Sequence, residues 1–164
     1  MTHVDETAEL DTPFLREAIR LSRTRMRQGR GGPFGAVVVR EGVIVARGWN
    51  AVTSSLDPTA HAEVVAIRRA CRKLDAFHLD GCVLYASCEP CPMCLAAAYW
   101  ARVERLVYAA TRDDAARAGF DDSLIYRELS LAPEARSLHT DHLLRAEAIV
   151  VFEEWLAKPD RVPY

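Results

Sequence analysis

Two short segments of this chain constrain its fold most, because their side chains can bind one metal ion. The first is His61-Ala62-Glu63, and the second is Pro90-Cys91-Pro92-Met93-Cys94. Two cysteines separated by two residues can chelate one ion, and a distant histidine supplies a third ligand of a type that zinc accepts. Each segment stands where we predict the first turn of a helix. If His61, Cys91 and Cys94 bind one ion, the fold must therefore bring two helix starts together.

Three protein ligands leave the fourth tetrahedral position of zinc open, which is typical of catalytic sites. Water at that position has its pKa lowered to about 7, so it becomes a nucleophile at neutral pH. Glu63 follows His61 by two residues and can take a proton from that water and pass it to a leaving group. The positive ends of two helices would favour thiolates and a developing negative charge. The pattern predicts one catalytic zinc per chain.

A closed structural site is the alternative. Cys88, Cys91 and Cys94 are spaced three apart and could form a Cys₃His site with the histidine. Cys88 and Cys91 also form a second Cys-x-x-Cys pair, which is open to a redox interpretation. However, Cys88 ends a predicted strand and Glu89-Pro90 breaks the chain after it, so Cys88 need not face the other two. A closed site would also leave Glu63 without a role, and we favour the catalytic site.

Composition limits the remaining classes. The chain has 164 residues, of which 50% are hydrophobic and 27% charged, and this predicts a single globular domain over 1–164. The longest apolar stretches, 95–101 and 148–152, are too short to span a bilayer. No basic start is followed by an apolar run, so we expect no secretory signal. Five cysteines, three of them clustered, favour metal or redox chemistry in a cytoplasmic protein over a disulfide framework.

The net charge of −2 argues against tight binding to a nucleic-acid backbone. The one feature in favour of such binding is a group of arginines in the first helix region. We interpret them as the solvated flank of an amphipathic helix, because most fall beside its apolar stripe. The group consists of Arg16, Arg20, Arg23, Arg25, Arg27 and Arg30.

Hydrophobic periodicity predicts an alternation of helices and strands. Helices are expected at 12–28, with Thr12 as N-cap and Pro13 as first residue, and at 61–74, 91–101, about 121–128 and 145–157. Strands are expected at 35–40, 43–48, 82–86 and 105–109, with a weak strand or loop at 138–143. The first two strands form a hairpin and the later strand–helix units should run parallel, which predicts an α/β fold.

The His-Ala-Glu and Pro-Cys-x-x-Cys segments resemble the signature of the zinc-dependent cytidine/deoxycytidylate deaminase superfamily, over roughly residues 12–130. The resemblance implies a three-layer α/β/α sandwich with a central five-stranded mixed sheet. It implies His61, Cys91 and Cys94 as the zinc ligands and Glu63 as the proton shuttle. The implied reaction is hydrolytic deamination, in which hydroxide adds to an amidine-like carbon of a heterocycle and ammonia leaves.

Further segments resemble the bacterial guanine deaminases within that superfamily. They are Pro33-Phe34-Gly35-Ala36, Asn50, the segment 57–63, the segment 118–123 with its Gly-Phe-Asp-Asp run, and the final Tyr164. This resemblance implies conversion of guanine to xanthine and ammonia by a homodimer. In that group an acidic residue of the Gly-Phe-Asp-Asp segment faces the base, and the C-terminal aromatic residue helps to close the pocket.

Guanine presents an N1–H and a 2-amino group, and a carboxylate is the matching acceptor. We predict that Asp122 contacts the base and relays a proton to the departing amine, with Asp121 in reserve. Either aspartate could instead cap the short helix. Asn50 can both donate and accept hydrogen bonds at the edge of the purine ring, although it could instead bond to the backbone at the end of a strand. Phe34 could stack on the purine or belong to the core. The predicted substrate-binding residues are Asn50, Phe34, Tyr164 and Ala62.

Three other functions compete. A tRNA adenosine deaminase shares both zinc segments but must also hold an RNA loop, which favours a basic surface. An amino-triazine deaminase would present the same donors to the same acceptors. A zinc-stabilised binding module without catalysis would use Cys88 as a fourth ligand.

Overall fold

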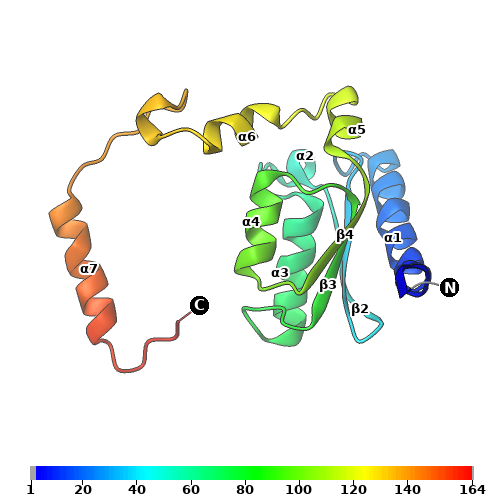
Figure 1. Cartoon of the computed structure of the whole chain (residues 1–164), viewed down its shortest axis with the longest axis horizontal. Coiled ribbons are helices and arrows are strands. Elements are labelled where there is room, and N and C mark those ends of the chain that lie inside the picture. The colour runs from blue at the N-terminus through cyan, green and yellow to red at the C-terminus, as the bar shows by residue number, and fades with distance from the viewer. Residues whose placement is uncertain (1–2, 164) are drawn as a thin grey trace. The chain divides into compact units, whose positions relative to one another are not determined.

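The computed structural model describes residues 3–163, with side chains described from residue 8 onward. The chain forms two compact units, Met1–Asp122 and Ser123–Tyr164 (Figure 1). The first contains α1 (His3–Arg27), β1 (Gly35–Arg40), β2 (Val43–Trp49), α2 (Val52–Ser55), α3 (Ala62–Leu74), β3 (Cys82–Cys88), α4 (Pro92–Trp100), β4 (Arg105–Ala110) and α5 (Arg112–Arg117). The second contains α6 (Ser123–Leu129), a 3₁₀ turn η1 (Pro133–Ala135) and α7 (Arg145–Ala157).

The first unit is built on a mixed sheet in the order β2-β1-β3-β4. β1 is antiparallel to both β2 and β3, and β3 is parallel to β4. The α/β class and the parallel β3–β4 unit are confirmed. The expectation of five strands is wrong for residues 3–163, where the sheet has four. Residues 138–143 are irregular there, and their leucines Leu138 and Leu143 are exposed instead of packing on a core.

Helices cover both faces of this sheet, which gives the predicted three layers. α1 lies on one face, and α3 and α4 lie on the other (Figure 1). Side chains of β1 alternate between the two: Val37 and Val39 pack with Leu21 of α1, whereas Ala36 and Val38 belong to the core under α3 and α4. The two central strands, β1 and β3, are buried on both sides over most of their length, which explains why their residues are mostly apolar.

Gly48 allows the start of α3 to lie directly on the sheet. A Cβ atom at Gly48 would lie 2.1 Å from the carbonyl oxygen of Ala62 and 2.6 Å from the backbone nitrogen of Ala66. Any larger residue would push α3 away from β2. Because His61 immediately precedes α3, this close approach also determines where His61 lies relative to the strand ends.

The first helix starts earlier than predicted. Thr12 and Pro13 were expected to begin it, but α1 begins at His3 and Pro13 lies inside it. The Thr12 hydroxyl donates to the Ala8 carbonyl (2.7 Å), one turn back, instead of capping the helix. Proline removes a single backbone donor, and here the helix continues through it.

Among the described residues, none of the helices combines the length and the apolar character that a membrane span requires.

Candidate metal centre

The structure brings the three predicted ligands together at the starts of two helices. His61 is the N-cap of α3 and Cys91 is the N-cap of α4, and Cys94 lies buried in the first turn of α4. The Nδ1 atom of His61 lies 3.5 Å from the Sγ atoms of both cysteines. The three donor atoms all lie within 4.8 Å of one another.

This geometry fits a zinc ion. Zinc bonds of about 2.0–2.1 Å to nitrogen and about 2.3 Å to sulfur, at tetrahedral angles, place the two donor atoms roughly 3.6 Å apart. The 3.5 Å distances between the histidine nitrogen and each sulfur match this expected separation of the donor atoms. The donor set of one imidazole and two thiols is also one that zinc prefers over calcium or magnesium.

The protonation of the two cysteines also suits metal binding. The pKa of Cys91 is lowered to about 4, chiefly because the Cys94 thiol donates a hydrogen bond to it. The same bond raises the pKa of Cys94, and the contact with Cys91 raises that of His61. One ligand is therefore already a thiolate at neutral pH, which is the form that binds a metal.

Glu63 lies beside this group without belonging to it. Its side chain is in the first turn of α3 and is only 7% exposed. Burial raises its pKa, and the negative charge of Cys91 raises it further. A raised pKa makes the Glu63 carboxyl a better proton acceptor, which suits a general acid–base residue.

Cys88 lies apart from the ligand group. Its Sγ donates to the carbonyl oxygen of Thr111 at 3.4 Å, at the end of β3. Burial raises the pKa of this thiol to about 11, so it stays protonated. Within the described residues, the group of donors close enough to share an ion contains His61, Cys91 and Cys94. The geometry therefore favours an open site over a closed Cys₃His site.

Asn50 is buried at the end of β2, and its orientation is determined by the backbone around it. Its Oδ1 accepts hydrogen bonds from the backbone nitrogens of Gly32 (3.1 Å) and Val52 (3.3 Å). A Cβ atom at Gly31 would lie 2.1 Å from the Asn50 carbonyl oxygen, so only glycine fits against it. The side-chain carbonyl is already occupied, which leaves the Nδ2 amide as the group to meet a base.

Of the two neighbouring aspartates, Asp122 is the shielded one and Asp121 is exposed. Burial raises the pKa of Asp122, and the negative charge of Cys91 raises it further. This electrostatic coupling relates Asp122 to the metal centre. Its contact with a base stays a prediction.

Phe34 is half-buried, and its ring packs edge-on against Phe120, with the centroids 4.9 Å apart. Phe120 was not singled out from the sequence, although it stands two residues before Asp122.

Ala62 is the buried first residue of α3, where backbone N–H groups have no partner within the helix. Tyr164 lies outside the described residues. Stacking by Phe34 and binding by Ala62 remain predictions.

Comparisons with known proteins agree with this site. Residues 8–110 match the family model described as the cytidine and deoxycytidylate deaminase zinc-binding region. Guanine deaminase of Bacillus subtilis is 53% identical over 87% of this chain and 91% of its own length. A crystal structure of guanine deaminase from Bacillus subtilis matches with a TM-score of 0.91 and 48% identity, over 100% of this chain and 99% of the other.

More distant relatives also match. A structure of guanine deaminase from Nitrosomonas europaea has a TM-score of 0.63 and 34% identity, covering 88% of this chain and 84% of the other. A tRNA-specific adenosine deaminase of Aquifex aeolicus is 42% identical over 59% of this chain and 64% of its own length. His61, Cys91 and Cys94 form the zinc-binding group, and the chain belongs to the cytidine and deoxycytidylate deaminase zinc-binding family.

Proposed function

We propose that this protein is a zinc-dependent guanine deaminase, an aminohydrolase that converts guanine and water to xanthine and ammonia. The observation that carries this proposal is the similarity to the Bacillus subtilis enzyme, which extends over 87% of the chain in sequence. The similarity to the tRNA-specific adenosine deaminase of Aquifex aeolicus extends over 59% of it. The zinc-binding group supplies the chemistry that the reaction requires.

The reaction replaces the 2-amino group of guanine by an oxygen taken from water. Zinc held by His61, Cys91 and Cys94 supplies the Lewis acidity that makes water nucleophilic at neutral pH. Glu63 accepts a proton from the attacking water and donates one to the ring as the C2–O bond forms. As the C2–N bond breaks, the C2 hydroxyl group loses its proton and becomes the carbonyl of xanthine, and the amine takes up a proton and departs as ammonia. The raised pKa of Glu63 suits both proton transfers.

The remaining predicted residues would bind and orient the base. Asp122 accepts hydrogen bonds from the donors on the N1 and 2-amino edge and relays a proton to the departing amine. The Nδ2 amide of Asn50 donates to an acceptor on the ring edge, since its Oδ1 is held by the backbone. Phe34 stacks on the purine, Ala62 offers its backbone N–H, and Tyr164 helps to close the pocket.

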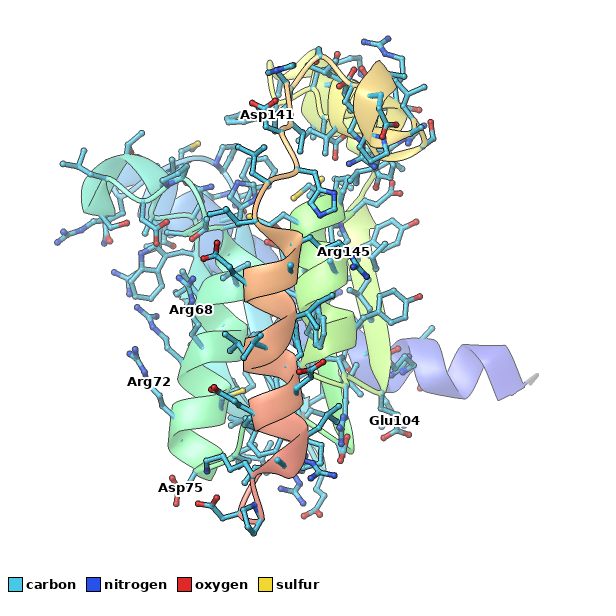
Figure 2. The ribbon with its side chains drawn as sticks, turned by 90° about the vertical axis from the view of Figure 1, so that its left-hand side faces the viewer. Arg68, Arg72, Asp75, Glu104, Asp141 and Arg145 are labelled. Atoms are coloured by element: carbon cyan, nitrogen blue, oxygen red, sulfur yellow. The ribbon has the colours of Figure 1, made fainter. Side chains whose placement is uncertain are left out.

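Glu63→Gln tests the mechanism. The zinc-loaded variant should keep one zinc per chain and lose at least about 100-fold in kcat for guanine, because general acid–base catalysis is removed. Conversion of guanine to xanthine, followed together with ammonia release, measures this. Glu104→Gln is the matched control. The Glu104 backbone nitrogen donates to the Cys82 carbonyl oxygen at the start of β3. Figure 2 shows Glu104 at the same end of the first unit as Asp75, the residue that follows α3, whereas His61 lies at the other end of that helix.

Normal turnover by zinc-loaded Glu63→Gln would exclude this mechanism. If the wild-type protein does not convert guanine, the next substrates are an amino-triazine and an adenosine in a tRNA anticodon loop. Absence of turnover on all three, with zinc bound, would favour a zinc-stabilised binding module.

We also propose that the enzyme is a cytoplasmic homodimer. All five cysteines are free thiols, which suits a reducing compartment. Two helices expose large apolar side chains: Tyr99 and Trp100 of α4 are 77% and 70% exposed, and Phe152 of α7 is 68% exposed. Exposed apolar side chains of this kind are typical of interfaces between proteins, and a second copy of the chain would cover those of each helix.

A further inference from the structure

Phe120 links two segments of the site that are far apart in the sequence. Its ring packs edge-on against Phe34 at an interplanar angle of 87°. Both rings also lie on Gly32, where a Cβ atom would be 3.4 Å from each of them. The contact therefore joins the segment after α1 to the segment after α5.

Each side of this contact carries one of the predicted base-binding residues. The Phe34 carbonyl oxygen accepts a hydrogen bond from the Asn50 backbone nitrogen (3.0 Å), so Phe34 and Asn50 form one backbone unit. On the other side, Asp122 follows Phe120 by two residues, a span of at most about 7 Å. The Phe120 backbone nitrogen donates to the Ala115 carbonyl (3.0 Å), which holds the same segment to the end of α5.

The two rings also border a cavity in the first unit. A cavity of about 320 Å³ lies between α1, the ends of β3 and β4, and α5, and both phenylalanines line it with Ser22, Ser87 and Cys88. The contact with Phe34 therefore restrains residues 120–122 together with the backbone hydrogen bond from Phe120 to Ala115.

We infer that Phe120 is a positioning residue for deamination, which places Asp122 opposite Asn50 through its contact with the Phe34 ring. The inference rests on the proposed function, because Asp122 and Asn50 are the groups that bind the base there. Phe120 itself need not touch the substrate. Its ring sets the distance between two groups that must contact the base together.

A double-mutant cycle with zinc-loaded protein tests this inference. Phe120→Ala should lower kcat/KM for guanine by roughly 10- to 100-fold, as displacement of a positioned group by about 1 Å does, while zinc stays at one per chain. In the Asp122→Asn background the same substitution should change kcat/KM by less than about 3-fold, because residues that act as a unit are not additive. Phe120→Leu should restore part of the loss.

Phe77→Ala is the matched control. Phe77 is exposed to a similar degree as Phe120 (53% against 45%) and packs edge-on against an aromatic ring, that of His78. This control should leave kcat/KM unchanged. Full additivity of Phe120→Ala and Asp122→Asn, or an unchanged kcat/KM in Phe120→Ala, would overturn the inference.

Amide hydrogen exchange separates this inference from the proposed function. In zinc-loaded Phe120→Ala without substrate, the amides of residues 120–122 should exchange faster than in the wild type, even if the wild type does not convert guanine. Unchanged exchange in that segment would reject the positioning role, whichever substrate the enzyme uses.

Discussion

Cys88 and Cys91 are three residues apart, yet only Cys91 belongs to the metal-ligand group. Cys88 is the last residue of β3 and donates to the Thr111 carbonyl, whereas Cys91 caps α4. The spacing alone allowed both to be ligands. The irregular segment Glu89-Pro90 lies between them, and the two side chains have different neighbours, as the sequence suggested.

Cys88→Ser should therefore keep zinc. The serine hydroxyl can donate the same hydrogen bond to Thr111, and the three ligand atoms are unchanged. Metal analysis of the purified variant should give one zinc per chain, and Cys91→Ser should bind less. Loss of zinc from a folded Cys88→Ser protein would support the closed Cys₃His site instead.

Asn50 shows how far residue-level prediction extends. Its place at the end of a strand was predictable from the sequence, and so was its suitability for a ring edge. The occupation of its Oδ1 by Gly32 and Val52 was not, because it depends on a loop that returns from α1. The tertiary structure thus converts a group that could donate or accept into one that donates.

At the scale of elements, the carboxylates of Asp11 and Glu17 form hydrogen bonds that join α1 to strands of the sheet. Asp11 accepts hydrogen bonds from Arg105 of β4 (2.5 and 2.7 Å) and from the Tyr85 hydroxyl of β3 (2.7 Å). Glu17 accepts from Arg20 on its own helix (2.6 Å) and from Arg47 of β2 (2.7 Å). These contacts join the first helix to both edge strands of the sheet.

Glu17 makes the free energy of unfolding depend on pH in the acid range. The Arg20 side chain, with Arg47, lowers the pKa of Glu17 to about 2 from an ordinary value of 4.5. A lowered folded-state pKa stabilises the protein above about pH 4.5, and this contribution is lost as pH falls through about 2. Since both arginines are about half exposed, we expect Glu17→Gln to cost only about 1 kcal/mol at pH 7.

Urea unfolding of wild type and Glu17→Gln between pH 2 and 7 measures this effect. The difference in the free energy of unfolding should shrink toward zero as the pH approaches 2, and comparing the two proteins cancels the effect of acid on the metal site. Glu9→Gln, exposed on the same helix, controls for the loss of one negative charge. A difference that does not change with pH would contradict the assignment.

Two arginines of α1, Arg20 and Arg25, have intramolecular partners. Arg20 pairs with Glu17, and Arg25 stacks on Trp49 with its guanidinium carbon 4.1 Å from the ring centroid. Arg69 of α3 stacks on the same ring at 4.1 Å. The helical flank was predictable from periodicity, but the contact between Arg25 and Trp49 of β2 was not, because it joins residues far apart in the sequence.

At the scale of the whole molecule, α4 and α7 are two helices that are rich in apolar residues and yet expose large apolar side chains. α4 carries Leu95, Tyr99 and Trp100 on its exposed side, while Cys94 and Ala98 face the core. α7 exposes five large apolar side chains, Val150, Val151, Phe152, Trp155 and Leu156. A helix with apolar residues on all sides is normally buried, and a helix as short as α7 is marginal in water by itself.

Phe152→Asp should therefore weaken the proposed homodimer. Wild-type protein should sediment at twice the mass of the 18.3 kDa chain, and the variant should shift toward one chain, because a charge would be buried in the interface. Phe77→Asp, at an exposed phenylalanine in the first unit, is the control. A wild-type protein that sediments as a single chain at micromolar concentration would contradict the homodimer.

The sequence by itself determined the zinc ligands, the neighbouring glutamate and the order of most helices and strands. These properties are local: they depend on ligand spacing, periodicity and the residues at helix starts. The tertiary structure decided that the described sheet has four strands, that α1 continues through Pro13, and that Phe120 meets Phe34. Strand pairing and side-chain contact join residues far apart in the chain, and their free energy depends on neighbours that no local pattern specifies.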